Sequence, residues 1–195
     1  MAKNRVAPLA LLATLAAAPA SAPAAKLTSL RTSLAASRCH AVASTAAADA
    51  APRTEGEDAA TPRLACDAPA PYRVFVEGAG SPQPELWVEA DGGFSVTLSP
   101  ADVDAFRFGP EIEWRLADGV PFAAILHVTT YSAAGGDEEH LLDPRHVSGE
   151  RILIKGLKGH ESLDALLDAR ATKTAGKVAL GLADREMDAV KTKKH

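Results

Sequence analysis

The stretch "EIEWRLADGVPFAAILHV", residues 111–128, decides the fold that the sequence predicts. Its first arm alternates apolar and charged residues, as a strand does when one face is buried and the other is solvated. The alternating apolar residues are Ile112, Trp114 and Leu116. Asp118-Gly119 follows, a dipeptide that tolerates the positive φ of a tight hairpin turn. Because residues 121–128 are apolar on both faces, we expect this second arm to be the central strand of an antiparallel sheet.

The regions on both sides of this hairpin supply further strands. Short alternating runs occupy residues 72–77, 85–90, 94–99 and 151–157. Asp91-Gly92 marks a second hairpin turn between two of them. Residues 162–169 fit a helix by the propensity of Ala and Leu, and a strand by their position after Lys158-Gly159. The residues alone leave both assignments open.

The C-terminal region has the pattern of an amphipathic helix. One apolar stripe recurs at helical spacing, opposite a face of Lys and Asp residues. The stripe consists of Ala175, Val178, Ala179, Leu182, Ala183, Met187 and Val190. A helix with one apolar face must bury it against another element. We therefore expect the α+β class, an antiparallel β-sheet of about six or seven strands packed by one C-terminal helix and tied by one disulfide.

Residues 1–24 have the pattern of a cleavable secretory signal peptide. Lys3 and Arg5 precede a short Ala- and Leu-rich run, and residues 20–22 supply the small side chains found before a cleavage site. The apolar run, of about 15 residues, is shorter than the stretch that a membrane-spanning helix needs. We expect the protein to be periplasmic or secreted and to have no membrane span. The cleavage position stays open.

Cys39 and Cys66 are the two cysteines of the chain. In an oxidising compartment such a pair most simply forms one disulfide. The segment between them is rich in Ala, Pro, Thr and acids and has no periodic apolar pattern, so we expect a mobile loop. The predicted plan is a leading segment and loop over 25–70, one α+β domain over 71–191, and a basic tail over 192–195. Whether the leading segment is strand or helix is open.

Composition and motifs narrow the function. The formal net charge is −4, and the basic run at the C-terminus is short, so the chain has no general attraction for nucleic acid. It contains no Gly-x-Ser-x-Gly elbow, and His160-Glu161 lacks the second histidine of a zinc-protease motif. We expect no nucleic-acid partner and no cofactor, and a binding module rather than an enzyme.

Two aromatic residues stand on the more polar faces of their predicted strands. Phe75 lies between Arg73 and Glu77, and Trp87 lies between two glutamates. Our default expectation is that the C-terminal helix covers both rings. If it does not, Phe75 and Trp87 form an exposed apolar patch that recognises a partner.

The connection over residues 132–149 gathers several acids and histidines. His140, Asp143 and His146 could hold a divalent metal ion if this loop were ordered. Metal sites usually stand on rigid elements with supporting hydrogen bonds, whereas this loop follows a flexible Gly-Gly pair. We therefore expect a solvated acidic loop and no metal site.

Three segments together resemble a family of small exported proteins of unknown function from Gram-negative bacteria. The segments are "IEWRLADGVPFAAIL" (112–126), "ILIKGL" (152–157) and "LLDARATKTAGKVALGLAD" (166–184). The likeness covers residues 66–187 approximately, and Cys39 and Cys66 stand where that family has its first cysteine pair. It implies a strand over residues 163–169 and no activity. Ser162 stands where relatives often carry a further cysteine.

The sequence thus predicts a non-enzymatic binding or envelope-associated module of the periplasm, with a periplasmic protein as partner. Periplasmic inhibitors of lysozyme and related hydrolases are similarly small, disulfide-tied and β-rich. An inhibitor of this kind is one alternative, although the chain has none of their inhibitory-loop motifs. A metal-dependent hydrolase that uses His140, Asp143 and His146 is the other alternative.

Overall fold

The computed structural model of the protein describes residues 24–42, 63–79, 81–100, 103, 105–132, 141–171 and 174–193. This part of the chain contains ten strands, one α-helix and two short 3-10 helices. The elements are β1 (Leu27–Ser33), η1 (Ala36–Arg38), β2 (Cys39–Val42), β3 (Arg63–Cys66), β4 (Tyr72–Glu77), β5 (Glu85–Ala90), β6 (Phe94–Thr97), β7 (Ala105–Ala117), β8 (Val120–Tyr131), η4 (Pro144–His146), β9 (Val147–Gly156), β10 (Asp164–Asp168) and α1 (Ala175–Lys193). The α+β class is confirmed.

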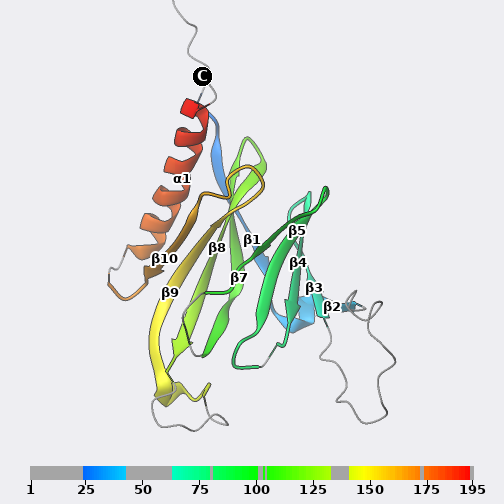
Figure 1. The fold of residues 1–195 in the computed structure, drawn as a ribbon, viewed down its shortest axis with the longest axis vertical. Helices are drawn as coiled ribbons and strands as arrows, with labels where there is room; N and C mark the ends of the chain where they lie inside the picture. Colours follow the sequence, from blue (N-terminus) through cyan, green and yellow to red (C-terminus); the bar gives the residue numbers. More distant parts are fainter. Residues whose placement is uncertain are drawn as a thin grey trace, which may run out of the picture.

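The strands form two antiparallel sheets of five strands each. Sheet A has the order β1-β7-β8-β9-β10, and sheet B has the order β2-β3-β4-β5-β6. As Figure 1 shows, α1 packs along sheet A on the side away from sheet B. The layers are therefore helix, sheet A and sheet B. β8 pairs with both β7 and β9, which confirms it as a central strand.

The expected count of six or seven strands in one sheet is wrong. The additional strands are β1, β2 and β3, all from the segment before residue 71. β2 and β3 have four residues each, too few to show a period of two, and β1 is exposed on both faces along its middle. The change of sheet between β6 and β7 also has no local signal, because sequence shows which strands are neighbours in the chain and not which ones pair.

The main core lies between the two sheets. Trp114 of β7 is fully buried there, stacks on Tyr72 of β4 with ring centroids 6.2 Å apart, and donates an Nε1 hydrogen bond to Thr32 at 2.8 Å. A large ring whose polar end has a partner stabilises a core without leaving a buried donor unsatisfied. Val74, Leu86 and the other alternating apolar residues point into the same layer, as their spacing predicts.

A second core lies between sheet A and α1. Ala175, Ala179 and Ala183 are buried against the outer face of the sheet, where Phe122 and Ile154 are also buried. Small side chains at every fourth position let the helix approach the sheet closely. Val178, which the apolar stripe also included, lies at the margin of this contact and is 41% exposed.

The structure shows the conformation of the hairpin turn and of residues 162–169, for which the residues alone left helix and strand open. Asp118 and Gly119 have φ values of 50° and 84°, the two positive angles that a type I′ turn requires. Asp164–Asp168 forms β10, which pairs with β9 at the edge of sheet A. The strand that the family resemblance implied is therefore confirmed.

Cys39 and Cys66 form the predicted disulfide. They are directly opposite one another in the β2–β3 pair, with Cα atoms 4.2 Å apart. The bridge ties β2, which follows the crossover from sheet A, to the rest of sheet B. Residues 1–23 of the predicted signal peptide (1–24) lie outside the described residues, as do residues 43–62 of the loop predicted between the two cysteines; the two ends of that segment form β2 and β3. No helix in the described part of the chain is long and apolar enough to cross a membrane.

Candidate functional site

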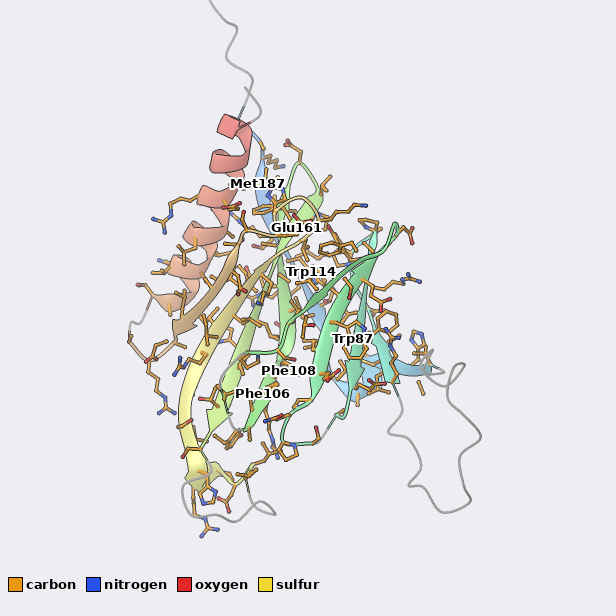
Figure 2. All side chains as sticks on the ribbon, in the orientation of Figure 1. Trp87, Phe106, Phe108, Trp114, Glu161 and Met187 are labelled. Atoms are coloured by element: carbon orange, nitrogen blue, oxygen red, sulfur yellow. A yellow bond between two sulfur atoms is a disulfide. The ribbon has the colours of Figure 1, made fainter. Side chains whose placement is uncertain are left out.

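The outer face of sheet B carries the two aromatic residues that the sequence singled out. Phe75 in β4 and Trp87 in β5 are direct register partners, and both are half-buried. Figure 2 shows Trp87 on sheet B, on the side of the molecule away from α1. The expectation that the C-terminal helix covers these rings is therefore wrong, because sheet A lies between the helix and sheet B.

An arginine covers the two rings in place of the helix. The guanidinium carbon of Arg63, from β3, lies 3.7 Å from the ring centroid of Phe75 and 4.8 Å from that of Trp87. Arg63 is only 8% exposed. A cation over an aromatic face is attracted by the ring quadrupole, by about 0.5–1 kcal/mol at exposed sites and more where water is excluded. The rings therefore hold the charge at a place where it is largely removed from solvent.

Glu89, which lies two residues after Trp87 on β5, fixes this arrangement. Its Oε1 accepts a hydrogen bond from Arg63 Nη2 at 2.7 Å and another from Trp87 Nε1 at 3.1 Å. One carboxylate thus orients both the guanidinium and the indole, and it balances the buried charge. We call the four residues Arg63, Phe75, Trp87 and Glu89 the Arg63 cluster.

The Arg63 cluster is suited to binding and offers no reactive group. It contains no nucleophile beside a base, and its carboxylate is engaged by an arginine. Around it the outer face of sheet B is polar and mixed in charge. The flanking residues on that face are Arg73, Glu77, Glu85, Ser95 and Thr97. The result is a preorganised aromatic and cationic centre with a polar rim, the anatomy of many protein interfaces.

Sequence reasoning found the two rings but missed Arg63 and Glu89. Glu89 could have been predicted, because residues two apart on a strand lie on the same face, and Trp87 and Glu89 are two apart. Arg63 was harder to predict, since β3 is only four residues long and begins within the segment predicted to be a loop. The sequence holds one signal for it. Arg63 and Cys66 are three residues apart, so in an extended strand Arg63 lies on the face opposite to that of Cys66.

Two of the three proposed metal ligands, Asp143 and His146, lie within the described residues. His140 lies outside them, Asp143 is the N-cap residue of the short helix η4, and His146 is the last residue of that helix. Asp143 accepts hydrogen bonds from Arg145, including Nη2 at 2.7 Å and the backbone N–H at 2.8 Å. These bonds hold the pKa of the Asp143 carboxyl well below its usual range. Within the described ranges, no three His, Cys, Asp or Glu residues are placed to hold a metal ion.

Fold and site together define an antiparallel β-sandwich with a helix on one outer face and an aromatic–arginine cluster on the other. No protein-family model matches the chain, and no curated protein or solved structure shows a significant match. The resemblance to small exported proteins of Gram-negative bacteria therefore stays a prediction.

Proposed function

We propose that this protein is an exported, non-enzymatic binding module that recognises a protein partner through the outer face of sheet B. The observation that carries the proposal is the Arg63 cluster on a sheet face that the helix leaves open. Trp and Arg are the residue types most enriched among the side chains that dominate binding energy at protein interfaces.

The geometry of the cluster favours a protein partner. The face is the side of a sheet, and a broad surface of this shape suits another folded surface more than a small molecule. Phe75 and Trp87 are held by Arg63 and Glu89 before any partner arrives, so binding costs little side-chain entropy. The same contacts also stabilise sheet B when no partner is bound, and the variant Trp87→Ala distinguishes this structural role from recognition.

The export part of the proposal has support of its own. The N-terminal residues 1–24 carry the charge and hydropathy pattern of a signal peptide, and the chain forms the Cys39–Cys66 disulfide. Mass spectrometry of the protein from the periplasmic fraction tests it directly. We expect a chain that lacks the signal segment and has no free thiol. Uncleaved chain with reduced cysteines in the cytosol would contradict it.

Site-specific photo-crosslinking tests the recognition face. Thr97, an exposed residue opposite Trp87 in β6, is replaced by a photoreactive amino acid in the full chain, and Val178 on α1 is the control position. After irradiation of cells that produce the protein, we expect a discrete crosslinked product from position 97 and none from position 178. Equal products from both positions, or none from position 97, would contradict the proposal.

A second variant separates recognition from folding. Trp87→Ala removes half of the aromatic pair, and near-ultraviolet circular dichroism then reports whether the Trp114 core is intact. We expect the crosslink from position 97 to be lost while the Trp114 signal stays. The crosslinked partner, identified by its mass, also decides between an envelope protein and a hydrolase. A hydrolase that the purified chain inhibits would establish the inhibitor alternative.

A further inference from the structure

The outer edge of β1 is the least protected strand edge in the described part of the molecule. β1 has seven residues, pairs with β7 in an unbroken register, and contains no proline. Its residues 28–31 are all exposed, and Leu30 is 44% exposed. The other edges are shorter, since β2 and β6 have four residues and β10 has five. A long unpaired edge of this kind is a template for another strand.

The hydrogen bonds at the two ends of β1 show which of its backbone groups face outward. Asp118 N–H donates to the Lys26 carbonyl at 2.9 Å, and Leu34 N–H donates to the Pro110 carbonyl at 2.8 Å. Residues 26 and 34 therefore bond toward β7, and in an antiparallel pair this property alternates. The backbone groups of the odd-numbered residues, Leu27 to Ser33, point away from β7 toward the free edge.

We propose that β1 pairs with β1 of a second copy of this chain, antiparallel and centred on Leu30. This register uses all seven residues. Leu27 pairs with Ser33 of the other copy and Ser29 pairs with Arg31, which gives about eight backbone hydrogen bonds. Leu30 then meets its own counterpart, so two exposed leucines cover each other.

The charges on β1 favour the register centred on Leu30 over the registers centred on adjacent residues. Arg31 forms an ion pair with Glu113 at 3.1 Å within its own chain, and in the proposed pair it lies opposite an uncharged serine. A register centred on Arg31 would place two arginines face to face, which is destabilising. A register centred on Ser29 would pair fewer residues. The strand is thus self-complementary at one position only.

Cysteine crosslinking tests the register. Because residue 30 bonds toward β7, the two copies of Leu30 form a non-hydrogen-bonded pair, whose Cα atoms are about 4.5 Å apart. Such a pair is within reach of a disulfide, and Cys39–Cys66 in this chain joins register partners at 4.2 Å. We expect Leu30→Cys, under mild oxidation, to form covalent dimer about tenfold more than Ser29→Cys does. Equal crosslinking of both variants would overturn the proposal.

A proline variant tests the same edge without a new thiol. Proline lacks the N–H, and at an outward-facing position of an edge strand it leaves the β1–β7 bonds intact. Ser29→Pro should therefore stay folded and lose the dimer, whereas the matched Ser29→Ala should keep it. Sedimentation velocity of the full chain over a range of concentrations is the measurement. The interface is small, so we expect a weak dimer. A wild-type chain that is monomeric up to about 1 mM would overturn the proposal.

Discussion

The two sheets differ in what covers their outer faces. On sheet A, α1 buries Ile152 and Ile154, and Arg115 forms a bidentate ion pair with Asp184 of the helix at 2.7 and 2.9 Å. On sheet B, among the described residues, the side chain of Arg63 covers two aromatic rings. Sheet A thus gains a second hydrophobic core, whereas sheet B keeps a polar face with one aromatic centre.

This difference follows from the pattern of apolar and charged residues along the strands. The β8 sequence is apolar at successive positions, which requires cover on both sides. β4 and β5 place charged residues on both sides of their aromatic residue, and a helix could not bury Arg73, Glu77 and Glu85 without partners. An arginine can cover such a face, because its guanidinium stacks on the rings and still reaches a carboxylate.

The largest expected effect comes from placing a charge under the helix. Ala179→Asp buries an unpaired carboxylate between α1 and sheet A, and we expect it to lower the free energy of unfolding by about 4 kcal/mol or more. The control is Val178→Asp, one residue away on the exposed side, with an expected change within about 0.5 kcal/mol. Urea unfolding followed by circular dichroism measures both. Similar losses for the two variants would mean that the helix does not cover sheet A.

Sheet B lacks the cover that α1 gives sheet A, so we expect its stability to depend on the Cys39–Cys66 disulfide. The bridge joins residues 27 apart, and a closed loop of this length is worth about 3.5 kcal/mol through the entropy of the unfolded chain. We expect the double variant Cys39→Ser/Cys66→Ser to lose about that much in urea unfolding. The Trp114 signal in near-ultraviolet circular dichroism should survive in the folded variant. A loss below about 1 kcal/mol would show that sheet B is held by its packing alone.

The sequence predicted the parts of this fold that local pattern controls. The β7–β8 hairpin, the disulfide and the C-terminal helix all follow from turn residues, cysteine count and apolar spacing. It left the segment of β1 open between strand and helix and missed β2 and β3, because short or exposed strands bury too little to leave a period. It also expected the helix to cover Phe75 and Trp87 in a single sheet, whereas α1 packs on sheet A. Which sheet a helix covers depends on long-range pairing, although the charges beside Phe75 and Trp87 were a usable signal against cover.

We expect a smaller loss in the free energy of unfolding when either of the two arginines on the outer faces, Arg115 or Arg63, is replaced. Arg115→Gln leaves the partly buried Asp184 without its ion pair, and Arg63→Gln leaves Glu89 and two rings without their cation. We expect each to cost about 1–2 kcal/mol in urea unfolding. The consequences should differ in kind, because only Arg115→Gln loosens α1. Hydrogen exchange of the α1 amides should therefore rise in that variant and stay unchanged in Arg63→Gln.

The smallest effect, and the most specific for the open face, is on the exposure of Trp87. In the variant Trp114→Phe, Trp87 is the remaining tryptophan, and acrylamide quenching of its fluorescence reports how far solvent reaches the indole. We expect intermediate quenching, since Arg63 shields one side of the ring and Glu89 holds its Nε1. Adding Arg63→Gln should increase quenching about twofold, because the cover is removed while the sheet stays paired. An indole as shielded as a core residue in both variants would mean that another part of the chain covers this face, and the recognition proposal would then lose its surface.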